Sequence, residues 1–305
     1  FIGYQAATGA GSAASCVGIG SAALAGAITQ DGTVGIGYQA LTALTSGAGN
    51  TAVGYATLVA QNTGSRNLAL GYQALNAAAS AEDDNIAIGY NAFGNLNNAA
   101  SDKNIVIGNY AADGAGTVGG ADNIFMGYGS GGGSWGGVAT ENVAIGNNTM
   151  GGALNSTVKN VAVGHNSMSA LTSGDQNTCI GWNSGAAMQS NSSCIAIGYQ
   201  ALDASTANAN NIAIGDDTMG SMADSGGNYN VALGGRALFT ANTAMIENTA
   251  LGYEAMGDLN HASADYNTAI GCYAMDGAAG HGHTENVFVG RNAGGGVWVN
   301  NACSY

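Results

Sequence analysis

Apolar and polar positions alternate in one short phrase that recurs from one end of the chain to the other. Its clearest copy reads Asn-Ile-Ala-Ile-Gly-Tyr-Asn-Ala-Phe over residues 85–93, and close relatives stand at 67–75 and 248–256. Three and one residues before the glycine stand Ile, Val, Leu, Met or Thr, with a small residue, usually Ala, between them. Apolar residues two apart share one face of a strand, so each copy predicts a short β-strand. We expect this apolar face to point inward, so that Ile88→Asp would open the structure locally.

The glycine of each copy marks a regular period. Successive marker glycines are 17 to 19 residues apart, and they are Gly3, Gly20, Gly37, Gly54, Gly71, Gly89, Gly108, Gly127, Gly146, Gly164, Gly181, Gly198, Gly215, Gly234, Gly252, Gly271 and Gly290. A short fixed period through a whole chain is typical of stacked units that bury their apolar sides against neighbours. Helices are disfavoured because every unit holds a Gly and the connections are rich in Gly, Ser, Asn and Thr. The pattern predicts an all-β fold, a parallel β-solenoid of about 17 coils, forming one domain over residues 1–305 with incomplete coils at both ends.

A column of asparagines stands four residues before the marker glycines. Its members are Asn50, Asn67, Asn85, Asn104, Asn123, Asn142, Asn160, Asn177, Asn211, Asn230, Asn248, Asn267 and Asn286. Only Cys16, Thr33 and Cys194 replace Asn at this position. Stacked in register, these side chains can form an amide ladder like those of other stacked β structures. The alternative is that Asn merely suits the turn before each strand, but a turn position would also admit Asp, Gly and Ser freely.

The incomplete coils at the two ends of the chain would together make one coil of normal length. Joining Tyr305 of one copy to Phe1 of another places Gly290 and the next Gly3 18 residues apart, within the internal period. We therefore expect copies to stack head to tail, which would pair the open β edges. The junction residues would be Phe1, Ile2, Gly3, Cys16, Cys303 and Tyr305, with Cys303 about one coil from Cys16. The alternative is that the chain is a piece of a longer repetitive protein.

Composition narrows the function classes. The chain has 305 residues, a net charge of −14 and only five Lys and Arg, a balance that excludes nucleic-acid binding through phosphate neutralisation. No apolar run reaches the ~20 residues of a membrane helix. Acidic residues gather before successive strands, as Glu82, Asp83, Asp84, Asp102 and Asp122. They could attract calcium, although a solvated acidic edge is the favoured interpretation, and no cofactor is expected.

Cysteine and histidine offer little chemistry. Cys179 and Cys194 would lie on adjacent coils, two and four residues before their markers. Their offset implies a Cα separation of ~8 Å, beyond the range of an unstrained disulfide, so two free thiols are favoured over a bridge. His281 and His283 have a spacing that metals can use, but no third ligand is apparent and no metal site is predicted. No catalytic set of Ser, His and Asp recurs, and no enzymatic role is expected.

Aromatic residues are the best candidates for contact with a ligand. Tyr38, Tyr55, Tyr72 and Tyr90 each follow a marker glycine and would form a column. Such a column could bind sugars through the ring faces, although packing against another chain or layer is the more common use of such a row. A Gly-rich stretch at 131–137 carries Trp135 and predicts a bulged surface loop with an exposed indole, a further candidate for glycan contact.

The repeated phrase resembles the Asn-X-Ala-Ile-Gly-Tyr-X-Ala-Leu repeats of bacteriophage tail-fibre proteins and bacterial surface fibres. It is also similar to the head repeats of trimeric autotransporter adhesins, which are left-handed parallel β-rolls. The resemblance covers nearly the whole chain and implies an extracellular or virion location, a non-enzymatic role and commonly a trimer. The longer period and the absence of a recognisable coiled-coil stalk or membrane anchor distinguish this chain from the adhesins.

These observations lead to two hypotheses. The first is a structural subunit of an extracellular filament or fibre that self-assembles by head-to-tail stacking of coils, with copies of itself as partner. The second is a phage tail fibre or adhesin head that binds surface glycans or a receptor. An antifreeze role is a weaker third option, because no flat Thr-X-Thr row occurs.

Overall fold

The computed structural model of the chain describes residues 1–9, 11–79, 81–222, 226–240, 244–259, 261, 263–277 and 282–296. Within this part of the chain every regular element is a three-residue β-strand, and no helix occurs. The residues form two compact units, unit 1 at Phe1–Val158 and unit 2 at Lys159–Tyr305. Each unit is a parallel β-solenoid, as the repeat predicts. One continuous domain over residues 1–305 stays a prediction.

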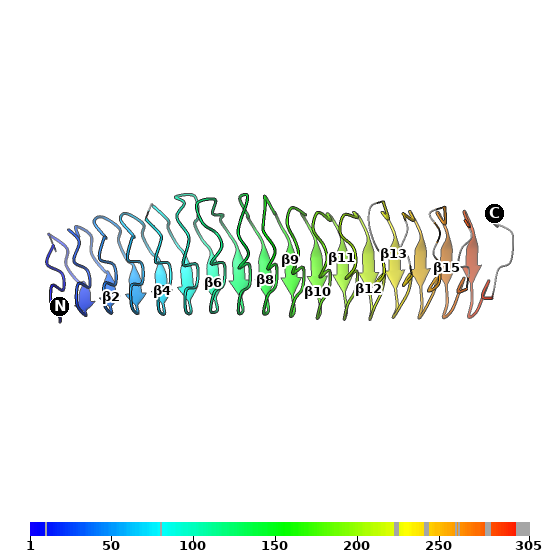
Figure 1. Cartoon of the computed structure of the whole chain (residues 1–305), viewed down its shortest axis with the longest axis horizontal. Coiled ribbons are helices and arrows are strands. Elements are labelled where there is room, and N and C mark those ends of the chain that lie inside the picture. Colours follow the sequence, from blue (N-terminus) through cyan, green and yellow to red (C-terminus); the bar gives the residue numbers. More distant parts are fainter. Residues whose placement is uncertain are drawn as a thin grey trace. The chain divides into compact units, whose positions relative to one another are not determined.

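Unit 1 contains eight strands, one in each repeat copy from the second onward. They are β1 (Val17–Ile19), β2 (Val34–Ile36), β3 (Thr51–Val53), β4 (Leu68–Leu70), β5 (Ile86–Ile88), β6 (Ile105–Ile107), β7 (Ile124–Met126) and β8 (Val143–Ile145). Each strand pairs in parallel with the next along the chain, as the arrows of Figure 1 show. The first copy contributes only a single bridge, from Ile2 to Ile19.

Unit 2 repeats this arrangement. Its strands are β9 (Val161–Val163), β10 (Thr178–Ile180), β11 (Ile195–Ile197), β12 (Ile212–Ile214), β13 (Val231–Leu233), β14 (Thr249–Leu251), β15 (Thr268–Ile270) and β16 (Val287–Val289). Pairing is in register throughout both units, so that Ala196 lies opposite Ala213 in unit 2 just as Ala69 lies opposite Ala87 in unit 1. Equivalent positions of the repeat therefore stack into columns.

The marker glycine turns the chain at the end of each strand. Gly89, for example, has φ +138°, a conformation that side chains rarely adopt. A Cβ there would lie 2.6 Å from the carbonyl oxygen of Gly108 on the next coil. Both the turn and the close approach of the two coils require glycine, which explains why this position never varies.

Hydrogen bonding between coils continues beyond the short strands. After the turn, Gln73 N–H donates to the carbonyl of Tyr55 on the preceding coil at 2.9 Å, and Leu75 N–H donates to Ala92 on the following coil at 3.0 Å. Both donors have left-handed backbone conformations, with φ of 55° and 49°. This alternation directs successive N–H groups to opposite neighbours. Each coil is thus bonded to both neighbours along its corner as well as its strand.

The core lies on the opposite side of the strand from the one that the sequence pattern suggested. In β5 the middle residue Ala87 is fully buried, whereas Ile86 and Ile88 on either side are half-buried and face outward. The same pattern holds in the other strands of both units, with the exception of β16. The expectation that Ile88 points inward is therefore wrong. The strand centre usually holds a small side chain in the narrow interior of the coil, and the larger pair lies outside.

Inside each coil, two facing positions usually pair a large side chain with a small one. The larger member usually stands four residues after the marker, so that Ala87 in β5 is matched by Phe93 in the same coil. Where the residue at the strand centre is large, the residue six positions later is small. Phe125 is matched by Gly131, where an added Cβ would lie 2.6 Å from the phenyl ring. Cys179 and Gly185 form a similar pair, at 2.7 Å. A large side chain at one of these two positions is thus matched by a small one at the other.

Replacing Ala87 and Ile88 separately by Asp should distinguish the two faces of β5. Ala87→Asp places a carboxylate in the closed core, and breaking packing with an unpaired charge should lower the free energy of unfolding by ~3–5 kcal/mol. Ile88→Asp removes only a half-buried side chain, whose full burial is worth ~1.5–3 kcal/mol, so the loss should be about 1 kcal/mol. Denaturant titration followed by circular dichroism measures both. Equal losses, or a larger loss for Ile88→Asp, would contradict the assignment of faces.

Candidate functional site

The asparagine column forms a continuous ladder of side-chain hydrogen bonds in unit 1. At each step from Asn50 to Asn142, one Oδ1 accepts two hydrogen bonds from the next Asn of the column, one from its backbone N–H and one from its Nδ2. Between Asn85 and Asn104 both distances are 3.0 Å. The amide then donates its other hydrogen to a loop carbonyl, as Asn104 Nδ2 does to Gly120 at 2.8 Å. A turn residue would not need this arrangement.

Unit 2 carries the same ladder with one interruption. The steps from Asn160 to Asn177, and from Asn211 through Asn230, Asn248 and Asn267 to Asn286, repeat the double acceptance. Cys194 stands in the column between Asn177 and Asn211. Its backbone N–H donates to Asn177 Oδ1 at 3.0 Å, and its Sγ lies 3.6 Å from the Asn208 carbonyl. The thiol replaces the amide donor but provides no amide acceptor for the next coil.

Cys179 and Cys194 are both free thiols, and no bridge joins them. Cys179 is the buried centre of β10, with its Sγ 3.7 Å from Met188 Sδ, whereas Cys194 belongs to the asparagine column. Burial raises the pKa of the Cys194 thiol to about 11 and raises that of Cys179 further above its ordinary value, with Cys194 adding to the effect. A neutral, enclosed thiol is a poor nucleophile, so these cysteines are structural.

The tyrosine column of unit 1 is exposed and its rings are stacked. Ring centroids are 5.2 Å apart from Tyr38 to Tyr55, 4.9 Å from Tyr55 to Tyr72 and 5.1 Å from Tyr72 to Tyr90, with interplanar angles of 16° or less. Sugar binding of the expected kind uses an open ring face. The faces of Tyr55 and Tyr72 are covered by neighbouring rings, so only ring edges and hydroxyl groups remain for a ligand. Tyr110 and Tyr128 extend the column beyond the four predicted tyrosines. Their contacts are edge-on, with centroids 5.2 Å apart from Tyr90 to Tyr110 and 5.8 Å apart from Tyr110 to Tyr128.

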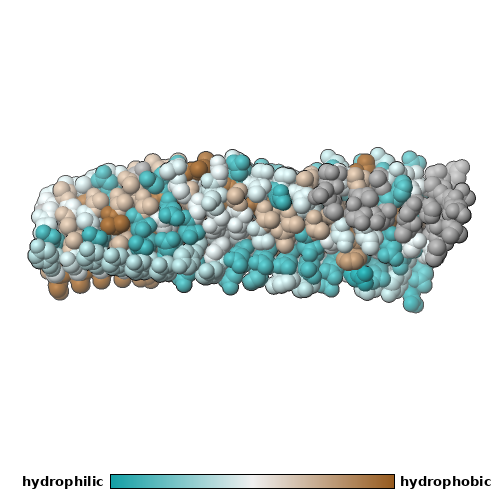
Figure 2. All heavy atoms as spheres, viewed as in Figure 1, coloured by the Kyte–Doolittle hydropathy of each residue, from teal (hydrophilic) through white to brown (hydrophobic). Residues whose placement is uncertain are grey.

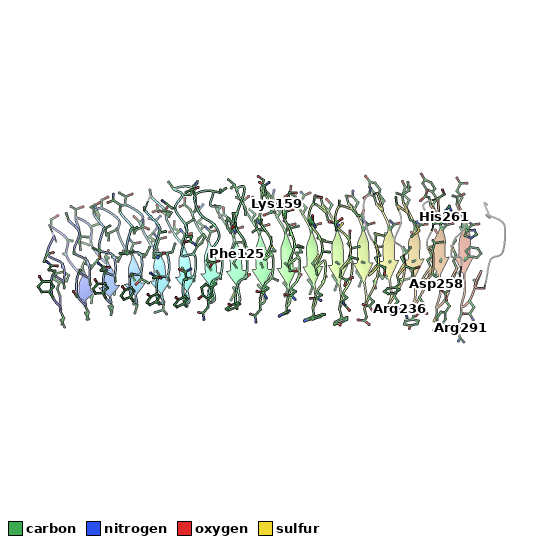
Figure 3. All side chains as sticks on the ribbon, viewed as in Figure 1. Phe125, Lys159, Arg236, Asp258, His261 and Arg291 are labelled. Atoms are coloured by element: carbon green, nitrogen blue, oxygen red, sulfur yellow. The ribbon has the colours of Figure 1, made fainter. Side chains whose placement is uncertain are left out.

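Trp135 is not a surface residue, contrary to the expectation from its Gly-rich loop. The side chain is 5% exposed, packs against Phe125 and Phe93 with centroids at 5.6 and 6.5 Å, and donates from Nε1 to the Gly131 carbonyl at 2.9 Å. Figure 3 labels Phe125, the central residue of β7. Gly131 leaves room for the Phe125 ring inside the coil, and the indole packs against that ring while its polar N–H is satisfied. Trp135 is therefore unavailable for glycan contact.

The acidic edge of unit 1 is used in hydrogen bonding between coils. Asp83 Oδ1 accepts from Ser65 N–H at 2.6 Å and Asp102 Oδ1 accepts from Asp83 N–H at 2.7 Å. Arg66 binds Asp84 through Nε at 2.6 Å, which lowers the pKa of that carboxyl. No group of three His, Cys, Asp or Glu side chains suited to a metal ion occurs among the residues that the structure describes. His283 is buried, and His281 lies outside those residues.

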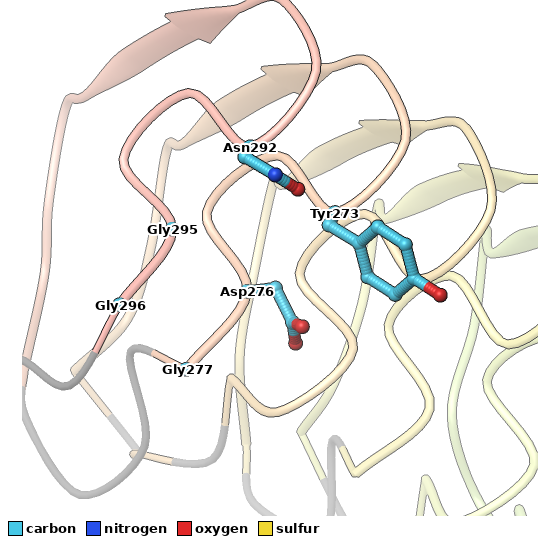
Figure 4. A pocket seen from close by; sticks show the side chains of 6 residues that line it. All are labelled: Tyr273, Asp276, Gly277, Asn292, Gly295 and Gly296. Atoms are coloured by element: carbon cyan, nitrogen blue, oxygen red, sulfur yellow. The ribbon is translucent and has the colours of Figure 1, made fainter.

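A shallow pocket in unit 2 is lined by Tyr273, Asp276 and Asn292 together with Gly277, Gly295 and Gly296 (Figure 4). Burial, followed by the nearby Asp258, raises the pKa of the Asp276 carboxyl. Earlier in the same unit, Arg236 and Glu254 form an ion pair at 2.7 Å. Figure 3 labels Arg236 and Asp258. The pocket lining holds one carboxylate and neither a thiol nor an imidazole, so it resembles a groove between stacked coils more than a catalytic centre.

The residues proposed for a head-to-tail junction are only partly described. Phe1 and Ile2 are 62% and 68% exposed, Gly3 has the marker-glycine conformation, and Cys16 is a half-buried free thiol. Cys303 and Tyr305 lie outside the described residues. No helix in the described part of the chain has the length and apolar character to cross a membrane.

Comparison with family models, with curated proteins and with solved structures finds no match to this chain.

Completing the ladder at Cys194 should stabilise unit 2. In Cys194→Asn the new Oδ1 can accept from Asn211 N–H and Nδ2, and the new Nδ2 can donate to Asn177 Oδ1, as at the other steps. At ~0.5–1.5 kcal/mol for each net hydrogen bond, the free energy of unfolding should rise by ~1–3 kcal/mol. Cys194→Ser is the matched control, because its single hydroxyl cannot supply both an acceptor and two donors. Thermal and denaturant unfolding report the difference, and a less stable Asn variant would contradict the ladder mechanism.

Proposed function

We propose that this chain is a non-enzymatic structural subunit of an extracellular filament or fibre, in which copies of the chain associate with one another. The observation that carries the proposal is that the same coil-to-coil bonding recurs at successive steps, through the backbone and the asparagine ladder. Such stacking has no intrinsic limit, so a coil at the edge of one copy can accept a coil of another. The buried polar groups serve this stacking and leave few for chemistry.

The open edges favour head-to-tail contact. In β16, Val287 and Val289 are 68% and 67% exposed, whereas Leu251 in β14, between two coils, is 43% exposed. An added coil would cover the difference in apolar surface and pair further backbone groups. Ile2 presents a comparable exposed side chain on the first coil. These edges are the proposed contact surfaces.

The outer face of the sheet supports lateral contact as a second mode of association. Two columns of half-buried or exposed apolar side chains run along it, including Ile36, Leu70 and Ile107 in unit 1. On the face drawn in Figure 2, hydrophobic residues are interspersed with hydrophilic ones. The net charge of −14 opposes close approach of copies at low ionic strength. Salt should therefore promote association by screening this repulsion.

Fibre formation is tested with the full chain over a series of protein concentrations at low and moderate salt, using electron microscopy and sedimentation. The expected result is fibres whose amount rises with concentration and salt. Ile2→Lys and Val289→Lys place charges at the open edges and should suppress fibres. Val138→Lys is the matched control, since Val138 is a loop residue that is 50% exposed. A monomer under every condition, or fibres indifferent to the edge variants, would contradict the proposal.

A second candidate is a glycan- or receptor-binding fibre, favoured by the exposed column of tyrosine hydroxyl groups. The stacked ring centroids are 4.9 to 5.2 Å apart, which suits repeated hydrogen bonds to a polymeric sugar better than ring-face stacking. Glycan-array binding should then vanish in the Tyr55→Ala, Tyr72→Ala double variant and also in the corresponding Phe variant, which keeps the rings. Binding retained by the Phe variant would exclude the hydroxyl groups, and no binding by the parent chain would reject this candidate.

A further inference from the structure

The tyrosine column holds phenol rings at contact distance on six successive coils of unit 1. The column runs through Tyr38, Tyr55, Tyr72, Tyr90, Tyr110 and Tyr128, with successive centroids 4.9 to 5.8 Å apart. The backbone fixes this spacing, because each tyrosine carbonyl from Tyr38 to Tyr90 accepts an N–H from the next coil at 2.9 Å. The rings remain accessible, at 38 to 53% exposure. The column is thus a rigid, water-facing series of phenols.

Outside the column, Tyr253 and Tyr273 in unit 2 also form a ring pair, with centroids 5.6 Å apart, but three other described tyrosines lack such a neighbour. Tyr4, Tyr229 and Tyr266 are 75%, 58% and 48% exposed, and none of them has a ring neighbour among the described residues. They are therefore as open to a reagent in solution as the column is, or more so. What distinguishes the column is the proximity of one phenol to the next.

We infer that the tyrosine column is a site of oxidative cross-linking, in which a peroxidase-type oxidant with hydrogen peroxide joins adjacent rings as dityrosine. Each phenol gives one electron to the oxidant and its hydroxyl proton to water, and each hydrogen peroxide that accepts two electrons and two protons becomes two waters. Two phenoxyl radicals on neighbouring coils then form one carbon–carbon bond between positions ortho to the oxygens. The hydrogen on each of these carbons moves to the oxygen as the rings regain aromaticity.

Proximity favours coupling between neighbouring rings of the column over coupling between tyrosines of different molecules. Groups held in near-attack geometry react as if at very high local concentration. The Tyr55 and Tyr72 rings have centroids 4.9 Å apart and planes that differ by only 6°, so a radical on one ring has a second phenol at contact distance. A radical on an isolated tyrosine such as Tyr229 must instead meet another molecule. Cross-links would tie each coil covalently to the next and so resist unfolding, independently of whether the chain forms a fibre.

The few basic residues make the cross-links easy to locate. Trypsin cleaves after Arg66, Lys103 and Lys159 and yields peptides 1–66, 67–103 and 104–159 from unit 1. A Tyr55–Tyr72 link joins the first two peptides, and a Tyr90–Tyr110 link joins the second and third. Treatment of the dilute full chain with peroxidase and hydrogen peroxide should give dityrosine fluorescence and both joined peptides by mass spectrometry. The treated chain should also unfold at a higher temperature than the untreated chain.

Variants that keep the ring provide the decisive comparison. Tyr55→Phe preserves stacking but has no hydroxyl, so the link between 1–66 and 67–103 should fall at least ~10-fold while the link between 67–103 and 104–159 persists. Tyr4→Phe, the control, should leave both links unchanged. Mixing chains with natural and heavy nitrogen separates linkage within a chain from linkage between chains. The inference is overturned if dityrosine does not form, if Tyr55→Phe leaves the first link intact, or if about half of the joined peptides carry mixed isotopes, as linkage between chains in an equal mixture would give.

Discussion

Register is the constraint on which the rest of this structure depends, and the asparagine side chain enforces it. An Asn Oδ1 that accepts both the backbone N–H and the Nδ2 of the equivalent Asn on the next coil leaves no freedom for a strand to slip. A slip of one residue would turn the inward Ala87 outward and would bring Ile86 or Ile88 into a core too narrow for it. It would also leave a buried amide without partners, at a cost of ~1–3 kcal/mol for each group. The ladder thus links the choice of one polar residue to the placement of every other column.

The regular stacking also explains why strands of only three residues are sufficient. Isolated short strands are marginal in water, but here the coil-to-coil hydrogen bonds continue around the corner through residues such as Gln73 and Leu75. Their left-handed backbones alternate the direction of the N–H groups, so each coil is held from both sides. The interior contributes to stability by matching large side chains with small ones, as the pairing of Phe125 with Gly131 illustrates. Stability is therefore distributed along each unit.

Much of the fold was predictable from the sequence, because period and in-register pairing follow from the repeat itself. The direction of the strand faces was not, since a two-residue alternation says which residues share a face but not which face is buried. A further signal could have resolved this. The residue at the strand centre and the residue six positions later are never both large, as with Ala87 and Phe93 or Cys179 and Gly185, which indicates that they share one confined space. Absence of Val, Ile and Thr at positions such as Gln73 and Leu75 would likewise have indicated left-handed backbones. The buried Trp135 differs from the sequence prediction because the glycines of a Gly-rich stretch can make room inside a coil as well as form a loop that bulges outward.

Hydrogen exchange of side-chain amides tests the register claim most directly. In deuterated water, followed by nuclear magnetic resonance, the Nδ2 protons of ladder residues such as Asn85, Asn104 and Asn123 should persist until the whole unit unfolds, because they are buried and doubly bonded. The Nδ2 protons of the exposed Asn109 and Asn147 should exchange at once. Equal and rapid exchange of both groups would contradict the account, because it would mean that the asparagines do not bind one another from coil to coil.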